Sequence, residues 1–472
     1  MTTPDEAGSW ALKMFGKAAL GDRRRVARLV AMAAQAATDP AGKITEVFRT
    51  DAERQGAYDF LESGHFVVAS ILGAMSVQAA SSCASEARVL AAIDGSSLTL
   101  VDGDDTKDFG AIGAYAHGAR GIKVVSAYAM TESGVPLGLL AQTFWTRPSV
   151  KPRKSKKRRA RKVEEKETQR WIETINATTE ALRSAAPNTR VWFQIDREGD
   201  SAPLLIALAE SGQDFTVRGR WDREIDDRLG RLRRKLAYSA TKGTYDLDVP
   251  KGPKRTARTA SMMVSAVEVT VTLKHPSTGK PTAQTLTAIL AREVSAVPNG
   301  EARIEWLLLT NTKVADIDDA MYVISCYAKR WRIEEFHKTW KSGACRVEES
   351  QLRSKEAVLR WATILAAVAV RIERLKYLSR VEPTLPASAE LTPLEIELII
   401  LLKRKHKKRT ETIPLGIAPT IADVTRWIAE LGGYTGKSSG GPAGTIVLRR
   451  GLERLHHALQ GFSLARGLPV KM

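Results

Sequence analysis

Two short apolar runs, each followed directly by an aspartate, place the strongest constraint on how this chain can fold. Val89 to Ile93 precedes Asp94, and Val191 to Ile195 precedes Asp196. A short apolar run bounded by polar residues is typical of a strand that is buried on both faces of a sheet. Functional side chains of α/β folds commonly lie where such strands end. We therefore expect two buried strands, each ending in an acid.

The segments around these runs indicate a sheet packed with helices. Residues 121–130 and 135–144 show strand patterns joined by a Gly-containing turn, which favours antiparallel pairing. Helical patterns cover residues 166–185 and 354–380. Alternation of buried strands with helices is typical of α/β proteins. A central α/β domain is therefore expected at residues 67–380.

Three further segments differ in character from this central pattern. Residues 213–311 are rich in β-branched residues and in turn-forming glycines and prolines, which predicts an inserted antiparallel β region. Residues 1–66 show short helical patterns, and residues 381–472 are helical after a Pro-rich hinge. We expect helical N- and C-terminal domains on either side of the central domain.

The stretch YAKRWRIEEFHKTWKSG, residues 327–343, is rich in helix formers and is expected to form one helix. At about 100° per residue, several of its polar side chains fall on one face. These side chains are Tyr327, Arg330, Glu334, Lys338 and Lys341. One interpretation is a solvated face with salt bridges such as Glu334 with Lys338. The other is a site where the carboxylate binds a divalent metal while the cations bind phosphates.

The charge balance of the chain points to a polyanionic partner. Its 472 residues include 72 Lys and Arg against 53 Asp and Glu, which gives a net charge of +19. Nucleic acids and anionic membrane surfaces both attract such a protein. No apolar run in the sequence is long enough to span a bilayer, and the N-terminus lacks a signal-peptide core. We therefore expect nucleic acid, and no membrane, as the partner.

A basic helix near the N-terminus strengthens this expectation. Asp22 is placed to cap a helix whose first turns carry Arg23, Arg24, Arg25 and Arg28. Cations at a helix N-terminus oppose the helix dipole, so we expect them to bind phosphates. The alternative is a basic helix that is merely solvated.

A second basic segment separates the paired strands from the following helix. Nine of the twelve residues from Lys151 to Lys162 are Lys or Arg. Such a run repels itself, and we expect a loop that is disordered or that is ordered by DNA. Contacts with phosphates would raise the affinity for DNA through the release of counterions.

The cysteines and histidines argue against a disulfide framework or a zinc site. Three cysteines stand far apart, and no CxxC pair occurs. A reducing cytoplasm is therefore the expected location. His337 lies in the polar helix, where we expect a surface or DNA-facing histidine rather than a metal ligand.

Three acids, Asp94, Asp196 and Glu334, form a candidate metal site. Hard carboxylate oxygens are the ligands that Mg²⁺ prefers, and Mn²⁺ is expected to substitute. Two such ions would generate a nucleophile and stabilise the leaving oxygen of an in-line phosphoryl transfer. We therefore expect two Mg²⁺ ions bound by these acids, with nucleic acid as the substrate.

The same residues resemble those of a known family. The three acids resemble the DDE triad of RNase H-like transposases and integrases. Tyr327, Arg330, Glu334 and Lys341 match the spacing of the Tyr-(2)-Arg-(3)-Glu-(6)-Lys signature of the insertion-sequence-four family. The stretches AALGDRRRVARLV, IDREGD and RIEWLLLT are similar to the Tn-five type within that family. The resemblance extends from Trp10 to the C-terminal helices.

The resemblance implies an RNase H-like mixed sheet as the catalytic core and a cut-and-paste reaction. A bacterial, nucleoid-associated enzyme would nick transposon ends, form and open a hairpin, and join the ends to double-stranded target DNA. The resemblance also implies a homodimer in the synaptic complex. End binding would fall to residues 1–66, and dimerisation to residues 381–472.

Matching positions imply roles for further residues. Trp306, in RIEWLLLT, would stack on a base flipped out of the hairpin, and its alternative is core packing beside Leu307 to Leu309. Arg218, in FTVRGRW, occupies a DNA-contact position. The phenol and cations of the signature would bind phosphates near the flipped base.

Two alternatives to an active transposase remain open. One is a catalytically silent or inhibitory derivative that binds DNA without cutting it, and the other is an RNase H-like nuclease that acts on structured nucleic acid. The intact triad favours an active enzyme over the first alternative. The signature helix and the additional terminal domains disfavour the second.

Overall fold

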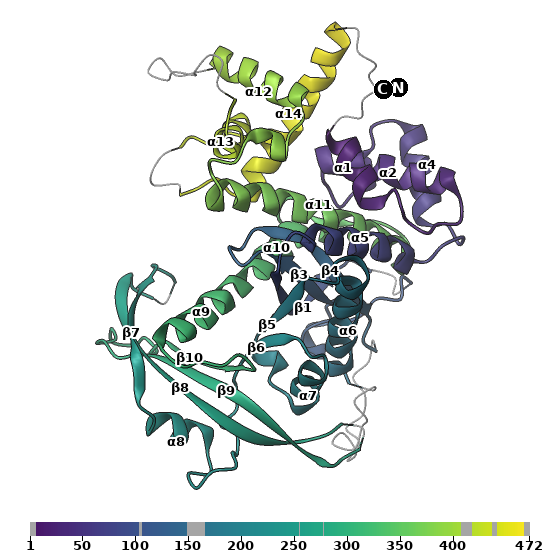
Figure 1. Ribbon diagram of the computed structural model, residues 1–472. Helices are drawn as coiled ribbons and strands as arrows, with labels where there is room; N and C mark the ends of the chain where they lie inside the picture. The colour runs from purple at the N-terminus through teal and green to yellow at the C-terminus, as the bar shows by residue number, and fades with distance from the viewer. Residues whose placement is uncertain are drawn as a thin grey trace.

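The computed structural model of the protein shows one large sheet surrounded by helices (Figure 1). The described residues are 6–102, 106–148, 166–253, 255–276, 278–406, 418–436 and 441–466. Within these ranges the strands are β1 (Arg88–Thr99), β2 (Gly110–Ala111), β3 (Arg120–Met130), β4 (Pro136–Trp145), β5 (Arg190–Ile195), β6 (Asp214–Arg218), β7 (Thr241–Val249), β8 (Arg258–Lys274), β9 (Pro281–Glu293) and β10 (Glu305–Thr310).

The order of the strands gives a mixed sheet. The strands lie in the order β2-β3-β1-β5-β6-β10-β9-β8-β7, and β4 pairs with β3. β5 is parallel to both β1 and β6. β3 and β4 pair antiparallel as expected, and β1 also pairs antiparallel with β3. This arrangement confirms the predicted α/β class, with the mixed sheet of an RNase H-like core.

The β region expected in residues 213–311 is a continuation of the same sheet. β7, β8, β9 and β10 pair antiparallel, and the long β8–β9 hairpin runs below α7 (Ala202–Glu210), against which β8 packs (Figure 1). β6 does not belong to this antiparallel set, because it is parallel to β5. The short helix α8 (Leu232–Ala237) packs on β8.

The first predicted acid does not lie at the end of a strand. β1 continues past Asp94 to Thr99, and Asp94 is paired with Ser126 of β3 in the middle of both strands. The apolar run ends at Ile93, but the backbone of the polar residues that follow it still pairs with β3. Asp196, in contrast, directly follows the last residue of β5, as predicted. Since β1 and β5 are parallel neighbours, the two acids lie on adjacent strands.

Helices cover both faces of the core strands. α5 (Val68–Cys83) and α6 (Thr168–Ala185) pack against β4, and α7 (Ala202–Glu210) follows β5. Gly138 of β4 has a φ of +156° and allows α5 to approach closely, because a Cβ at this position would lie 2.4 Å from the Cβ of Ala79. The core on this side is dominated by buried aliphatic side chains.

The helix expected over residues 327–343 is part of a longer, interrupted element. α9 (Ile317–Ala328) begins at its N-cap Asp316, a 3-10 turn spans Lys329–Trp331, and α10 (Arg332–Lys341) follows. The stretch expected to form one helix is therefore helical up to Lys341 but interrupted by a 3-10 turn. A 3-10 turn advances by three residues per turn instead of 3.6. It thus rotates Tyr327 relative to Glu334 and places Tyr327 in a separate helix.

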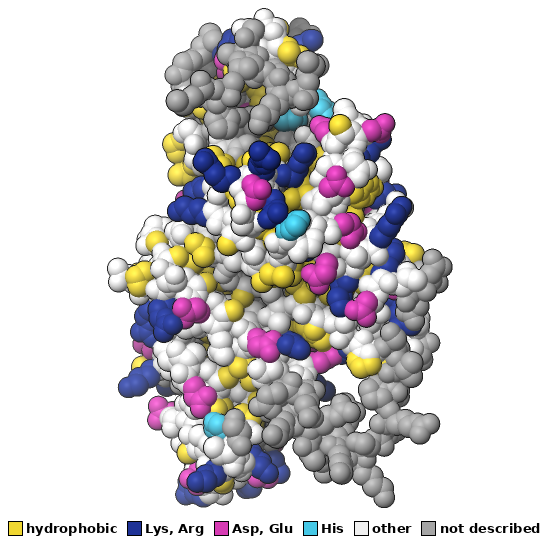
Figure 2. Space-filling view, turned by 90° about the vertical axis from the view of Figure 1, so that its right-hand side faces the viewer, with side chains coloured by type: hydrophobic (Ala, Val, Ile, Leu, Met, Phe, Trp, Pro, Cys, Tyr) yellow, Lys and Arg dark blue, Asp and Glu magenta, His cyan; other side chains and the backbone are white. Residues whose placement is uncertain are grey.

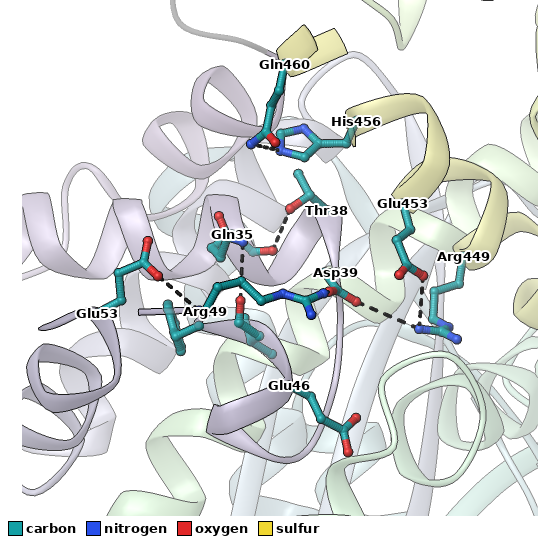
Figure 3. A network of polar contacts seen from close by, with 12 residues as sticks. Gln35, Thr38, Asp39, Glu46, Arg49, Glu53, Arg449, Glu453, His456 and Gln460 are labelled. Carbon is teal, nitrogen blue, oxygen red and sulfur yellow. Dashed lines mark hydrogen bonds and ion pairs between the residues drawn. The ribbon is translucent and has the colours of Figure 1, made fainter. Parts of the chain in front are cut away.

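Helical regions flank the core at both ends of the chain. The N-terminal helices are α1 (Glu6–Phe15), α2 (Arg23–Thr38), α3 (Ile44–Val47) and α4 (Asp51–Leu61), and the C-terminal helices are α12 (Pro393–His406), α13 (Ile421–Leu431) and α14 (Thr445–Ala465). Asp22 caps α2 by accepting a hydrogen bond from the backbone of Arg24, as predicted. Figure 3 shows where the two ends meet: Asp39, after α2, contacts both Arg49 and Arg449 of α14.

The long helix α11 (Lys355–Val381) joins these regions to the core. Its buried Arg360 donates hydrogen bonds to the carbonyl oxygens of Leu61, Ser63 and Phe66, just after α4. The indole of Trp361 bonds the carbonyl oxygen of Gly42. In Figure 1, the N- and C-terminal helices lie on one side of α11 and the sheet on the other.

Charged side chains cover the outside of this fold. On the face shown in Figure 2, Lys and Arg side chains are interspersed with Asp and Glu rather than forming one continuous basic surface. Of the helices in the described part of the chain, none has both the length and the apolar character needed to cross a membrane.

Candidate active site

The helix α10 places Glu334 beside the middle of β1, because the opposite face of the helix is buried. The ring of Phe336 stacks on Tyr128 of β3, with 5.2 Å between the ring centroids, and on Trp340. The indole of Trp340 donates a 2.9 Å hydrogen bond to the carbonyl oxygen of Ala362 in α11. These contacts fix the helix between the sheet and α11, so that Glu334 is directed toward Asp94.

Three side chains form a compact group that could hold a metal ion. Asp94, Glu334 and His337 each offer one ligand atom, and these atoms all lie within 4.8 Å of one another. His337 is only 5% exposed, and its Nδ1 lies 3.5 Å from Oδ2 of Asp94. The expectation of a surface or DNA-facing histidine was therefore wrong. The spacing of Glu334 and His337, at i and i+3, could have indicated that they share a helix face.

Arg330 provides a positive charge within this group of acids. Its Nη1 lies 3.9 Å from Oδ1 of Asp94 and 3.5 Å from Oε1 of Glu334. The Arg330 side chain is 11% exposed, so the surrounding medium screens these charges less than water does. The predicted proximity of Arg330 and Glu334 on one helical turn is thus observed.

The second strand-end acid lies beside the group without being a member of it. Burial, assisted by the negative charge of Asp94, raises the pKa of Asp196. Burial and the charge of Asp94 also raise the pKa of Glu334. Glu198, two residues after Asp196, is a fourth carboxyl whose pKa is raised by burial and by both aspartates. The four carboxyl groups therefore lie close enough to repel one another.

The donor set fits a divalent cation. Carboxylate oxygens are preferred ligands of Mg²⁺ and Mn²⁺, and like charges that raise each other's pKa are relieved by a bound cation. Asp94 is 8% exposed, and a carboxylate at such a position needs a positive charge nearby. Asp94 and Glu334 would hold one ion, with Asp196 at its side.

An aromatic and basic wall adjoins the acids. The ring of Trp306 on β10 packs edge-on against Tyr327, with 5.5 Å between centroids, and the guanidinium of Arg218 lies 5.6 Å from the Trp306 ring. Trp306 is half-buried, whereas Tyr327 is 3% exposed. Burial raises the pKa of Tyr327, although the charges of Arg330 and Arg218 oppose the rise. The structure thus brings together the predicted DNA-contact residues Trp306, Tyr327, Arg218 and Arg330.

A small cavity of about 140 Å³ opens next to Arg218. Four arginines line it, together with Glu305: these are Arg197, Arg218, Arg220 and Arg233. Burial and the charge of Arg197 lower the pKa of Arg218, which indicates an excess of positive charge. Such a cavity is suited to an anion. Only Arg218 of its arginines was among the predicted site residues.

The remaining predicted contacts are more dispersed. Lys338 is exposed on α10, and Nζ of Lys341 lies 3.6 Å from Oε1 of Glu348. Glu348 also accepts a hydrogen bond from the backbone N–H of Thr99 on β1. Lys341 is therefore partly neutralised by a carboxylate. Glu335, next to Glu334, forms ion pairs with Arg332 and Lys376 instead of pointing into solvent.

The predicted basic segments lie away from these acids along the chain. Arg24 and Arg28 are exposed at the start of α2, and Nη1 of Arg25 donates to the carbonyl oxygen of Leu20. The basic run 151–162 lies outside the described residues.

Comparison with known families agrees with this geometry. The family model described as "Transposase DNA-binding" matches residues 7–66, and the model described as "Transposase DDE domain" matches residues 140–371. The first range contains α2 with its arginines. The second contains Asp196 and Glu334, whereas Asp94 precedes it. Together the two matches cover more than half of the chain.

Proposed function

The chain belongs to the DDE transposases, and we propose that it cuts a DNA segment out of one site and joins it to another. DDE transposase domains use divalent metal ions for this chemistry. The observation that carries the proposal is the meeting of Asp94 and Glu334 around the guanidinium of Arg330. Carboxylates for metal and a cation for phosphate are the groups that phosphoryl transfer on DNA requires.

The acids take the metal-binding role in this proposal. Asp94, Asp196 and Glu334 would hold two Mg²⁺ ions, for which Mn²⁺ would substitute. Bound ions of this kind lower the pKa of a water or hydroxyl nucleophile and stabilise the leaving oxygen. Arg330, which lies beside Asp94 and Glu334, would bind the scissile phosphate. The raised pKa values of Asp196 and Glu334 support the proposal, because they reflect burial together with the negative charge of Asp94, and a bound cation would offset both.

The aromatic and basic wall binds the DNA end during hairpin formation and opening. Trp306 stacks on a flipped base, while Tyr327 and Arg218 bind the neighbouring phosphates. The support is geometric: Arg218 and Tyr327 both contact the half-buried Trp306 ring. Lys338 and Lys341 extend the phosphate contacts along α10.

The wider assembly follows the insertion-sequence-four pattern and its Tn-five type. Residues 1–66 bind the transposon end through Arg24, Arg25 and Arg28, and the matched DNA-binding range supports this assignment. Residues 67–380 form the catalytic domain, and residues 381–472 form the dimer of the synaptic complex. Strand transfer then joins the ends to target DNA, in the bacterial cytoplasm at the nucleoid.

The decisive experiment uses the DNA that flanks the gene of this protein. The purified protein is incubated with labelled duplexes of both flanking ends and Mg²⁺, and the products are sized on a denaturing gel. Nicks at defined positions, followed by hairpins, support the proposal. End binding without any cleavage in Mg²⁺ or Mn²⁺ would instead identify a catalytically silent DNA-binding derivative.

A further inference from the structure

Glu334 and His337 stand three residues apart on α10, and both lie next to Asp94 of β1. Residues at i and i+3 are neighbours on a helix, and Glu-x-x-His pairs of this spacing bind metals in helical carboxylate proteins. We propose that His337 is a nitrogen ligand of the metal site, so that one ion is held by two carboxylates and one imidazole. The inference rests on the proposed metal-dependent function and adds a ligand outside the acidic triad.

The distances suit a shared ion. The ligand atoms of the three side chains lie within 4.8 Å of one another, and His337 Nδ1 is 3.5 Å from Asp94 Oδ2. Ligands at about 2.1 Å from a metal are themselves roughly 3 to 4 Å apart. A small inward movement of the side chains is therefore sufficient. Both elements that carry them are held firmly, because β1 is an inner strand and α10 is anchored to α11 by Trp340.

The burial of His337 gives an independent indication. The side chain is 5% exposed, and its Nε2 is buried without a hydrogen-bond partner among the described residues. Buried polar atoms of native proteins are nearly always paired, because an unpaired one costs free energy. A cation bound between the three side chains would coordinate the ring through Nδ1, which faces Asp94, and so would account for a polar ring at this buried position. An ordinary core position would instead favour an apolar residue.

A nitrogen ligand changes which metals the site prefers. Carboxylates suit Mg²⁺ and Mn²⁺, whereas imidazole raises the affinity for later transition metals such as Ni²⁺. A site made of oxygen ligands alone would show less of this preference. The identity of the ligands can therefore be tested by comparing a hard and a softer metal in the same protein.

The test measures metal binding by the full-length protein without DNA. Isothermal titration calorimetry with Mg²⁺ and with Ni²⁺ compares the wild type with His337→Ala and His337→Gln. We expect both substitutions to lower the Ni²⁺ affinity by about tenfold or more, and the Mg²⁺ affinity by less than about threefold. Pulsed EPR of the Mn²⁺-loaded wild type should show coupling to a directly bound ¹⁴N nucleus, which His337→Ala removes.

The controls separate this inference from its alternatives. His65→Ala, at an exposed histidine between α4 and α5, should leave both affinities and the ¹⁴N coupling unchanged. An equal loss of Mg²⁺ and Ni²⁺ affinity in both His337 variants would overturn the inference, because it would show that His337 only orients Asp94. Unchanged affinities in His337 variants with wild-type circular dichroism would also overturn it.

The proposed function fails in a different way. Absence of DNA cleavage by a wild type whose Mn²⁺ spectrum shows the His337-dependent coupling would contradict the transposase activity but support the metal ligand. Cleavage by a wild type without that coupling would support the activity and exclude the ligand.

Discussion

Arg330 lies 3.5 Å from Glu334, one helical turn further along, and so places a guanidinium beside a carboxylate that is expected to bind metal. The same Nη1 atom lies 3.9 Å from Asp94. Arg330 therefore compensates two acids in the protein as it stands. A metal ion and Arg330 are alternative sources of positive charge for these acids, and this relationship leads to the first prediction.

Replacing Arg330 by Gln should destabilise the metal-free protein by about 1 to 3 kcal/mol, because the buried Asp94 carboxylate and the partly exposed Glu334 carboxylate lose their partner. Added Mg²⁺ should then raise the melting temperature of Arg330→Gln more than that of the wild type. Differential scanning calorimetry with and without Mg²⁺ measures both effects. Arg330→Lys, which keeps the charge, is the matched control and should respond like the wild type. Equal Mg²⁺ responses in all three proteins would contradict this view of the site.

Neutralising any one of the three acids should abolish DNA cleavage while end binding persists. Asp94→Asn, Asp196→Asn and Glu334→Gln each remove one charged ligand, and we expect rates to fall about a thousandfold or more. Cleavage and electrophoretic mobility shift assays measure the two properties separately.

The matched control for the acids is Glu335→Gln. Its carboxyl pairs with Arg332 and Lys376 rather than with the metal group, so the variant should cleave DNA but unfold at a lower temperature. Normal cleavage by any of the three triad variants would remove that residue from the metal site.

Trp306→Ala should impair hairpin formation or opening more than the first nick. The ring packs against Tyr327 and Arg218, so its loss removes a stacking surface worth about 1 to 3 kcal/mol per base. Time courses that resolve nicked, hairpin and opened products measure each step. Trp306→Phe keeps an aromatic surface and should restore part of the activity. An equal loss at every step would indicate a folding defect instead.

The stability of the protein at low pH should depend on Glu167. Burial acts to raise the pKa of this carboxyl, but hydrogen bonds and charges from Arg147 and Lys123 lower it from 4.5 to about 2. A lowered folded-state pKa stabilises the protein above the unfolded value, and this stabilisation is lost as the pH falls through about 2. Because the side chain is 40% exposed, solvent screening limits the contribution to about 1 kcal/mol.

Urea denaturation of the wild type and Glu167→Gln tests this prediction. The difference in the free energy of unfolding should be largest near pH 6 and should vanish toward pH 2. A difference that stays constant across this interval would show that the ion pairs of Glu167 contribute nothing to stability.

Neutralising the basic run should weaken DNA binding most at low salt. For each phosphate contact that is lost, the slope of log affinity against log salt becomes less negative by about 0.9. Substituting Lys156, Lys157, Arg158 and Arg159 by Gln should therefore flatten the salt dependence measured by fluorescence anisotropy. The same slope in the variant and the wild type would make this run a solvated loop.

The position predicted from the sequence, at the end of a strand, is correct for Asp196 and wrong for Asp94, although Asp94 does lie on a buried strand. Both predictions used the end of an apolar run to mark the end of a strand. β5 does end there, but β1 continues because its backbone still pairs with β3 beyond Ile93. Backbone pairing depends on the neighbouring strand, which local hydrophobicity does not report.

The signature helix shows the same limit. The spacing of Arg330 and Glu334 was sufficient to predict that they meet, since both lie within one turn. Tyr327 lies beyond the 3-10 turn, and its buried position against Trp306 follows from a contact with β10. The proximity of His337 to Asp94 likewise depends on how α10 is packed between the sheet and α11. In the sequence, only the i, i+3 spacing of Glu334 and His337 indicates that the two side chains share a helix face.

The α11 helix connects the matched DNA-binding range to the helix that carries Glu334. Arg360 and Trp361 hold the chain that follows α2 and α4, and Ala362 holds Trp340 of α10. These three anchors are consecutive residues near the N-terminal end of α11, so the chain after α2 and α4 and the helix α10 are fixed at almost the same point of one helix. The position of the cut would then be set by a fixed distance within the protein, from the DNA bound by residues 7–66 to the acids of the active site. Changing the DNA sequence at the cleavage point would then affect cleavage less than changing the spacing between that point and the DNA bound by residues 7–66.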